Sequence, residues 1–415
     1  VPICLSLIGS CSGPKTDRSN DGSSLPASTI EPEATRDGGT TARPEGPVVN
    51  RSRPEAEDEE PAPTEPAVQL IGRFDARDPI GPRCAWPGCR IVARFDGTSV
   101  SVRLTEEQAG WMLGGPSEWD VAIDGVWQPK IVATPGTRDY RLASDLPRGV
   151  HVVELYKRSE AQNGTTQFVG YDFGGGTLLP PPPRKRRRIE IIGDSQPAAF
   201  GVEGVGHGPM CPGLNYAAQW QNFRRSFGAR LGVALSAEVM GSVYSGKGMA
   251  KNIWHPDTET MPVLYPRSLP VDRSSTWDFS AYVPGVVIIM LGGNDFAVGK
   301  PYDQGPATLA DFTRAYDDFV VGVRQSYPAA HVFLVVSPSV TDEQPPGRAS
   351  RTNVIAGIEA VAARRASAGD ARVYTFVPAL AAKSELTGCE GHGSPEFHQR
   401  VADELLPLVR EKVGW

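Results

Sequence analysis

A serine that directly follows an apolar, β-forming segment is the residue of this sequence best placed to do chemistry. Residues 189–192 read Ile-Glu-Ile-Ile and precede Gly193-Asp194-Ser195. A strand that ends in a tight turn here would put the serine hydroxyl at the carboxyl edge of a sheet, where open α/β sheets bind their ligands. Such a serine is a candidate nucleophile if a base can reach it, although Asp-Ser after a strand is also an ordinary helix N-cap.

Small and polar residues also follow the later apolar segments, namely Ser245-Gly246, Asn294, and Glu390 with His392. The carboxyl ends of parallel strands lie at one edge of a sheet, so these residues can meet Ser195 there. Acyl transfer needs such a set: a nucleophile, a base, and N–H donors that face the oxyanion. The pattern therefore predicts a site for acyl transfer.

The elements that must position these residues alternate along the second half of the chain. Strands are expected at residues 189–192, 235–240, 286–291, 332–336 and 373–376, and helices at 215–231, 312–325, 353–366 and 395–413. The continuous β-branched run at 286–291 is typical of a strand covered on both faces. This order predicts a three-layer, doubly wound α/β domain of flavodoxin type over residues 189–415.

Residues 67–179 have a different pattern. Short segments of alternating apolar and polar residues are interrupted by Asp96-Gly97 and Asp124-Gly125. Short strands with turns at this spacing predict a β-sandwich or jelly roll. Residues 180–188, which read Pro-Pro-Pro-Pro-Arg-Lys-Arg-Arg-Arg, are expected to be a solvated linker between the two domains.

The formal charge of −6 is confined to one region. Residues 11–66 hold 12 Asp and Glu against 6 Lys and Arg, which leaves the rest of the chain near neutral. A nucleic-acid partner is therefore not expected, because no broad basic surface is available for phosphates.

The first residues indicate export. The sequence Ile8-Gly9-Ser10-Cys11 resembles a bacterial lipobox, in which Cys11 would carry the lipid and residues 1–11 would be the remnant of the signal. Residues 12–66 are rich in Ser, Pro and Glu and are expected to be a disordered tether. We expect an exported protein, an outer-membrane lipoprotein or one at the cell surface or in the periplasm. The alternative is a stray apolar start with a spare cysteine. The sequence has no run of 18 apolar residues, so no membrane span is predicted.

The blocks around Ser195, Gly246, Asn294 and His392 resemble the SGNH, or GDSL-type, hydrolases. With the sandwich in front, the chain is similar to carbohydrate esterase family 2. Further stretches carry this likeness: Gly72-Arg73-Phe74-Asp75, residues 245–252 and residues 276–280. The resemblance implies removal of acetyl groups from polysaccharides such as xylan and glucomannan.

The resemblance also implies a role for each residue. Ser195 matches the nucleophile, and its own N–H is one oxyanion donor. The N–H of Gly246 and the side chain of Asn294 match the other two donors. His392 matches the base that takes the serine proton. No cofactor and no metal are implied, and no two histidines have the i,i+4 spacing of helical metal ligands.

The residue that orients His392 departs from the family pattern. Cys389 stands where most SGNH enzymes have aspartate, three residues before the histidine. Glu390, two residues before it, is our candidate orienter, and a backbone carbonyl is the alternative. Trp254, Trp277 and Asp295 are the expected substrate-binding residues.

Four cysteines beyond residue 11 pair evenly. Cys84 and Cys89 flank a short turn, while Cys211 follows the serine block and Cys389 precedes the histidine. Disulfides Cys84–Cys89 and Cys211–Cys389 are possible in an oxidising compartment, and four free thiols in a reducing one.

Two other functions stay open. The first is an SGNH lipase or thioesterase, which an aliphatic lining would favour, whereas Trp254, Trp277 and polar loops favour sugar. The second is a catalytically weak carbohydrate-binding protein, which the changed acidic residue would favour.

Overall fold

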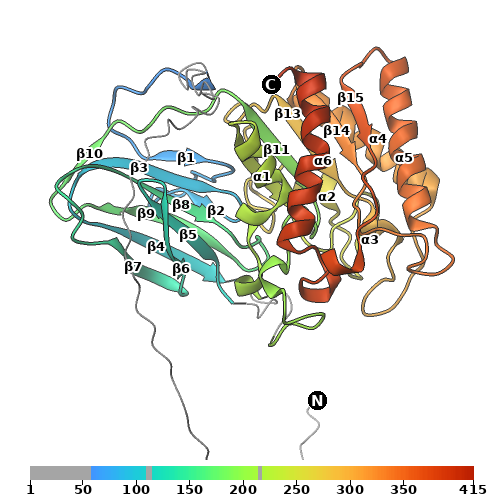
Figure 1. Cartoon of the computed structure of the whole chain (residues 1–415), viewed down its shortest axis with the longest axis horizontal. Helices are drawn as coiled ribbons and strands as arrows, with labels where there is room; N and C mark the ends of the chain where they lie inside the picture. The colour runs from blue at the N-terminus through green and yellow to red at the C-terminus, as the bar shows by residue number, and fades with distance from the viewer. Residues whose placement is uncertain (1–57, 109–114, 214–216) are drawn as a thin grey trace, which may run out of the picture. The chain divides into compact units, whose positions relative to one another are not determined.

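The computed structural model describes residues 58–108, 115–213 and 217–415, and residues 1–57 with Cys11 and most of the expected tether lie outside them. In the first domain, strands pair into one sheet of order β1-β3-β8-β5-β6, with β10 beside β3, and a second of order β2-β9-β4-β7 (Figure 1). The strands are β1 (Gln69–Ile71), β2 (Arg83–Cys84), β3 (Arg90–Gly97), β4 (Val100–Gln108), β5 (Glu118–Ile123), β6 (Val126–Val132), β7 (Gly136–Ala143), β8 (Gly149–Lys157), β9 (Gly164–Asp172) and β10 (Thr177–Leu179).

Alternation along these strands builds the sandwich. In β4 the side chains of Val102 and Leu104 are buried, while that of Arg103 between them is exposed. Trp119 of β5 and Leu155 of β8 join them in the core. This confirms the predicted β-sandwich, because residues two apart share one face of a strand.

The second domain is a parallel sheet of order β12-β11-β13-β14-β15. Its strands are β11 (Arg188–Gly193), β12 (Glu238–Val243), β13 (Val286–Met290), β14 (His331–Val335) and β15 (Val373–Phe376). Its helices are α1 (Phe227–Ala234), α2 (Met261–Leu264), α3 (Gly293–Phe296), α4 (Leu309–Ser326), α5 (Ser350–Ser367) and α6 (Pro395–Val413). Single-turn 3-10 helices are η2 (Val202–Gly204), η3 (Ala218–Trp220), η4 (Phe223–Arg225), η5 (Lys383–Glu385) and η6 (Cys389–Gly391).

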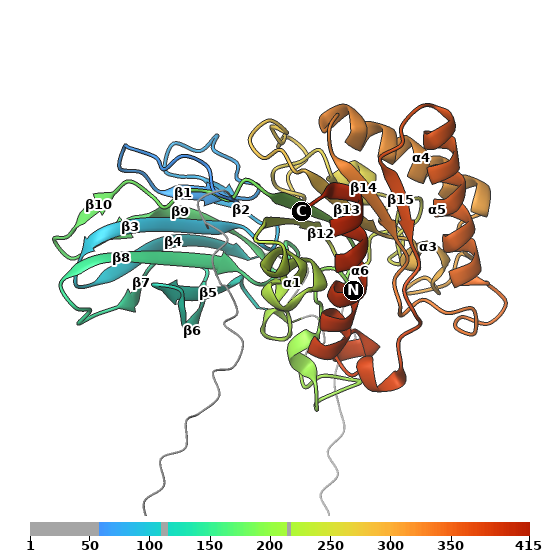
Figure 2. The same cartoon turned by 45° about the horizontal axis from the view of Figure 1, so that its top comes forward.

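Successive residues of the central strand β13 face opposite helix layers. Val287 and Ile289 pack with residues of α4 and α5, whereas Val286 and Ile288 pack with residues of α1 and α6. Figure 2 shows the sheet between these two layers. The strand order is the doubly wound one of flavodoxin type, so the predicted three-layer fold is confirmed.

The helix expected at residues 215–231 is mostly wrong. Residues 214–216 lie outside the described part, η3 and η4 follow, and α1 begins only at Phe227. The Oγ of Ser226 accepts a hydrogen bond from the N–H of Ala229 at 3.1 Å, which caps the helix. This N-cap decides where the helix starts, and the apolar periodicity upstream belongs to buried turns.

A fully buried ion pair joins the two domains. Arg73 of the sandwich donates from Nη2 to Oε1 of Glu190 on β11 at 2.8 Å, and neither side chain has exposed surface. The guanidinium lies over the ring of Tyr265, with Cζ 4.6 Å from the ring centroid. Glu190 also accepts from Ser242 Oγ at 2.6 Å and from Tyr265 Oη at 3.0 Å. These partners satisfy the carboxylate, as a buried charge requires.

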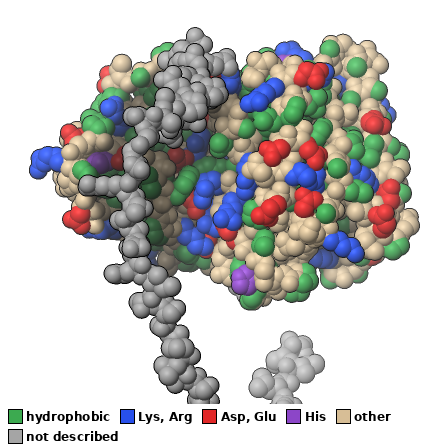
Figure 3. Space-filling model, in the orientation of Figure 1, with side chains coloured by type: hydrophobic (Ala, Val, Ile, Leu, Met, Phe, Trp, Pro, Cys, Tyr) green, Lys and Arg blue, Asp and Glu red, His purple; other side chains and the backbone are tan. Residues whose placement is uncertain are grey.

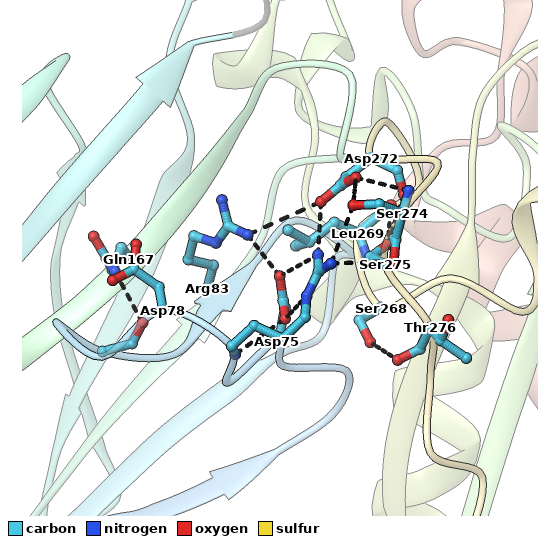
Figure 4. Close-up of polar contacts among 12 residues, drawn as sticks. Asp75, Asp78, Arg83, Gln167, Ser268, Leu269, Asp272, Ser274, Ser275 and Thr276 are labelled. Carbon is cyan, nitrogen blue, oxygen red and sulfur yellow. Dashed lines mark hydrogen bonds and ion pairs between the residues drawn. The ribbon is translucent and has the colours of Figure 1, made fainter.

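A second group of charges links the domains nearer the surface. Asp75 accepts from Arg77 at 2.7 Å and from Arg83 at 2.7 Å, and Arg77 also donates to Asp272 of the second domain at 2.7 Å. Figure 4 shows Asp75, Arg83 and Asp272 turned toward one another. The hydrogen bond from Arg77 lowers the pKa of Asp75 to about 2.

The basic linker is not simply solvated. Residues 58–60, which we assigned to the disordered tether, form an antiparallel bridge with it at Glu59 and Lys185. Arg187 lies 3.1 Å from the carboxylate of Asp58, and Arg188 pairs with Glu60. Opposite charges on the two segments explain why residues 58–60 are ordered and why the basic linker is paired with them. Elsewhere, basic and acidic side chains are interspersed on the face drawn in Figure 3.

The expected disulfide between Cys84 and Cys89 is absent, and both are buried free thiols. The Sγ of Cys89 contacts the carbonyl oxygen of Arg73 at 3.5 Å. No helix within the described residues is long and apolar enough to cross a membrane.

Arg73→Met is expected to lower the free energy of unfolding by about 3–5 kcal/mol, because it leaves the buried Glu190 carboxylate without its counter-charge. The double variant Arg73→Met/Glu190→Gln should recover part of that loss. The control is Arg103→Met, which removes an ion pair to Asp139 whose two side chains are 56% and 61% exposed. The control should cost at most about 1 kcal/mol. Equal losses in urea unfolding for the two single variants would refute this account.

Candidate active site

Ser195 and His392 meet at the carboxyl edge of the parallel sheet. The Oγ of Ser195 lies 2.8 Å from Nε2 of His392, although 197 residues separate them. The turn after β11 is tight, since a Cβ at Gly193 would lie 2.4 Å from Cγ of Pro197 within the turn and 2.5 Å from the carbonyl oxygen of Met290 on the neighbouring strand β13. Only glycine fits there, and the chain then turns so that the serine faces the histidine.

The hydrogen bonds of His392 fix its tautomer. Its Nδ1 lies 2.8 Å from the carbonyl oxygen of Cys389, which can only accept, so Nδ1 carries the proton. The Nε2 lone pair is then free to accept from the serine hydroxyl. Burial lowers the pKa of His392 below its usual value, opposed by the bond to Cys389 and the charge of Glu390. The imidazole is therefore neutral at neutral pH, as a general base must be.

Glu390 does not orient His392 in this structure, so our candidate assignment is wrong. The single Nδ1 proton is bound to the carbonyl of Cys389. The Glu390 carboxylate lies 3.7 Å from Nζ of Lys300, and its residue has a left-handed backbone with φ of 54°. This conformation belongs to the tight turn η6, which brings the carbonyl of Cys389, three residues back, onto the imidazole.

The histidine loop is fastened to the serine loop. Cys389 is disulfide-bonded to Cys211, with the two Cα atoms 5.3 Å apart. The N–H of Gly393 donates to Oε1 of Gln196 at 3.2 Å, and the N–H of Glu390 donates to the carbonyl of Pro209 at 2.6 Å. Sequence reasoning missed Gln196, because nothing local in Ser195-Gln196-Pro197 signals a contact so far along the chain.

Gly246 and Asn294 lie at the same edge. Gly246 has φ of +80°, and a Cβ there would lie 2.9 Å from Cδ1 of Trp254. Both the backbone conformation and the close approach of Trp254 therefore require glycine at this position. The Nδ2 of Asn294 donates to the carbonyl of Lys247 at 2.8 Å and to Oδ2 of Asp194 at 3.2 Å. Among the described residues, no backbone acceptor is bonded to the N–H of Ser195 or Gly246.

Two of the three expected substrate-binding residues are buried. Trp277 is only 6% exposed and packs against Ile71, Val92, Met240 and Tyr282. Asp295 has no exposed surface, and its carboxylate accepts from the backbone N–H groups of Met249, Ala250 and Lys251 at 2.6–3.0 Å. Neither side chain can reach a sugar. Asp295 instead holds the loop that follows Gly246, and these two assignments are wrong.

Trp254 does lie at the rim of the site, 45% exposed. The Nζ of Lys300 is 5.3 Å from its ring centroid, and the exposed ring of Tyr302 lies 4.8 Å from that of His255. Trp254 and Tyr302 line a cavity of about 160 Å³. Lys300 and Tyr302 were not anticipated, because their segment carries no motif. Within residues 58–108, 115–213 and 217–415, no cluster of three His, Cys, Asp or Glu could hold a metal ion.

Two family models match the chain. The model described as the carbohydrate esterase 2 N-terminal domain matches residues 70–183. The model described as GDSL-like lipase/acylhydrolase matches residues 189–405. The matched ranges correspond to the sandwich and to the parallel-sheet domain.

Curated relatives agree with these matches. The chain is 32% identical over 365 residues to the cellulase/esterase CelE of Acetivibrio thermocellus, covering 87% of this chain but only 41% of that protein. It is 25% identical to an acetylxylan esterase/glucomannan deacetylase of Cellvibrio japonicus, covering 85% of this chain and 91% of the relative.

A solved structure matches along its whole length. It is a family two carbohydrate esterase from Clostridium thermocellum in complex with cellohexaose, with 32% identity and a TM-score of 0.74. The match covers 84% of this chain and 100% of that one. The chain therefore belongs to family 2 of the carbohydrate esterases and is an ester hydrolase of the GDSL-like type.

Proposed function

We propose that this protein removes O-acetyl groups from carbohydrate of the xylan or glucomannan type, through an acyl-enzyme on Ser195. The observation that carries the proposal is the 2.8 Å contact between Ser195 Oγ and His392 Nε2, with Nδ1 held by a carbonyl. The acetyl substrate is supported by the names of the relatives, acetylxylan esterase and glucomannan deacetylase.

The reaction proceeds in two halves. His392 Nε2 takes the Ser195 proton as Oγ bonds to the acetyl carbon, which gives a tetrahedral oxyanion. The imidazolium then donates that proton to the departing sugar oxygen as the ester bond breaks, which leaves acetyl-serine. A water gives its proton to His392, attacks the acetyl carbon and releases acetate, and the proton returns to Ser195.

Three groups would stabilise the oxyanion: the N–H of Ser195, the N–H of Gly246 and the amide of Asn294. The two N–H groups stand without backbone acceptors in the described structure. The Asn294 amide exchanges its longer bond, 3.2 Å to Asp194, for one to the oxyanion. Each such donor is typically worth about 10²–10³-fold in turnover.

Trp254 is the residue proposed to bind the sugar. Its exposed indole offers the apolar face on which a pyranose ring stacks. Trp254 lies against Gly246, so a stacked sugar would hold its acetyl group next to the serine hydroxyl.

We also propose that the protein acts outside the cytoplasm, held to a membrane by lipid on Cys11. The lipobox-like residues 8–11, the polar segment that follows them and the Cys211–Cys389 disulfide support this.

Ser195→Ala and His392→Ala are each expected to lower acetate release by about 10⁴-fold or more, because nucleophile and base act as a unit. Acetate release is measured from acetylated xylan and acetylated glucomannan. A chromogenic acetate and a long-chain ester are assayed beside them. Preference for the long-chain ester would favour a lipase, and no turnover of any ester would favour a binding protein.

Glu390→Gln is expected to change the maximal rate less than about threefold, because the Cys389 carbonyl already holds the imidazole. The negative charge of Glu390 raises the pKa of His392, and the positive charge of Lys300 lowers it. The acid limb of kcat/KM should therefore move to lower pH in Glu390→Gln and to higher pH in Lys300→Met. A loss in Glu390→Gln as large as that of His392→Ala would restore Glu390 as the orienter.

Cells fed labelled palmitate are expected to yield a labelled protein, and Cys11→Ala should abolish the label. Label retained in that variant would contradict the assignment of Cys11.

A further inference from the structure

Glu160 is a buried carboxylate of the sandwich that reaches into the second domain. It follows β8 and has no exposed surface. Its Oε2 accepts from the backbone N–H of Ser245 at 2.7 Å, and its Oε1 accepts from the Oγ of the same serine at 2.7 Å. Both carboxylate oxygens are thus bound to the residue that precedes Gly246.

We propose that Glu160 is a positioning residue of the oxyanion hole, by which the sandwich domain sets the direction of the Gly246 N–H group. The proposal rests on the proposed function, which makes that N–H an oxyanion donor.

The two bonds hold Ser245 through its backbone N–H and through its side chain, one residue before the proposed oxyanion donor. Gly246 has a backbone conformation that only glycine adopts readily. Because glycine is flexible, contacts from neighbouring residues must keep that conformation. The preceding N–H, of Tyr244, donates to the carbonyl of Gly193 at 3.0 Å, which ties the loop to the serine turn. Glu160 supplies the tie at Ser245, between that contact and Gly246.

Glu160 is itself held rigidly. Its N–H donates to Oε1 of Gln221 at 2.7 Å. The buried Lys157 donates from Nζ to the carbonyl of Ser159 at 2.8 Å and lies 3.5 Å from that of Glu160. Burial raises the pKa of Glu160 to about 7, and the two hydrogen bonds from Ser245 oppose that rise. Perturbed carboxyls of this kind cluster at functional sites.

The matched control lies in the same domain. Glu106 is a buried carboxylate of β4 that also accepts from one backbone N–H, of Ser117 at 2.7 Å, and one hydroxyl, of Thr166 at 2.6 Å. Both of its partners belong to the sandwich. A role of Glu160 in stability alone would make the two carboxylates equivalent.

The experiment compares Glu160→Ala, Glu160→Gln, Ser245→Ala and Glu106→Ala in the full chain. We measure turnover of a chromogenic acetate, inhibition by phenylboronic acid, whose Ser195 adduct mimics the tetrahedral oxyanion, and affinity for a deacetylated xylo-oligosaccharide. Glu160→Ala is expected to lower kcat about 10–100-fold, because a misdirected oxyanion donor should cost less than the roughly 10²–10³-fold of a donor removed outright. Boronate affinity should weaken by a similar factor, with sugar affinity unchanged.

Glu160→Gln keeps an acceptor for the Ser245 N–H and should recover most of the activity. Ser245→Ala removes only the hydroxyl bond and should show a smaller loss, which keeps the test valid if Glu160→Ala does not fold. Glu106→Ala should lower the melting temperature without changing boronate affinity. The proposal is overturned if Glu160→Ala keeps wild-type kcat and boronate affinity, or if Ser245→Ala keeps both where Glu160→Ala does not fold. It is equally overturned if the Glu160 variants lose boronate and sugar affinity in parallel with Glu106→Ala.

Failure of the proposed function looks different. It would appear as a wild-type protein that releases no acetate. Boronate affinity of the Glu160 variants against wild type would still decide the present inference, because the adduct needs only Ser195 and the oxyanion donors.

Discussion

A guanidinium and a carboxylate, both buried away from water, fix how the two domains are placed relative to each other. Arg73 comes from the sandwich and Glu190 from β11, the strand that ends in Ser195. A buried ion pair is a poor source of stability, because its desolvation cost offsets most of the attraction. It is instead very sensitive to geometry, since a displaced partner leaves a bare charge. The pair therefore fixes where the sandwich sits against the strand that carries the nucleophile.

This fixed placement allows the first domain to take part in the chemistry of the second. Glu160 reaches Ser245 only if the loop after β8 lies against the loop after β12. The ion pairs that Arg77 makes with Asp75 and with Asp272 also link the two domains. They lie nearer the surface and constrain the placement of the domains less. The sandwich is thus part of the structure that shapes the site, and its removal would expose buried charges on both sides.

Much of the site could be predicted from sequence, because Ser195, Gly246 and Asn294 directly follow strands. Strand ends are local signals, and parallel pairing brings them together by topology alone. The mistaken residues differ in kind. Trp277 and Asp295 are polar or aromatic residues near motifs, and whether such a side chain faces the cleft or the interior depends on packing from distant segments. The same holds for residues 58–60, whose acidic run looks disordered until the basic linker is placed beside it.

The orienting group of His392 shows why a sequence motif and a chemical role can separate. A carboxylate side chain can turn to meet an imidazole, whereas a carbonyl is part of the backbone and points where the chain points. The Cys389 carbonyl serves only if residues 389–392 are held still, and they are held by the Cys211 disulfide, by Gln196 at Gly393 and by Pro209 at Glu390. The cysteine that stands in place of aspartate thus supplies both the acceptor and the cross-link that aims it. A carbonyl does not titrate in water, so this arrangement leaves His392 as the group whose protonation limits the base at low pH.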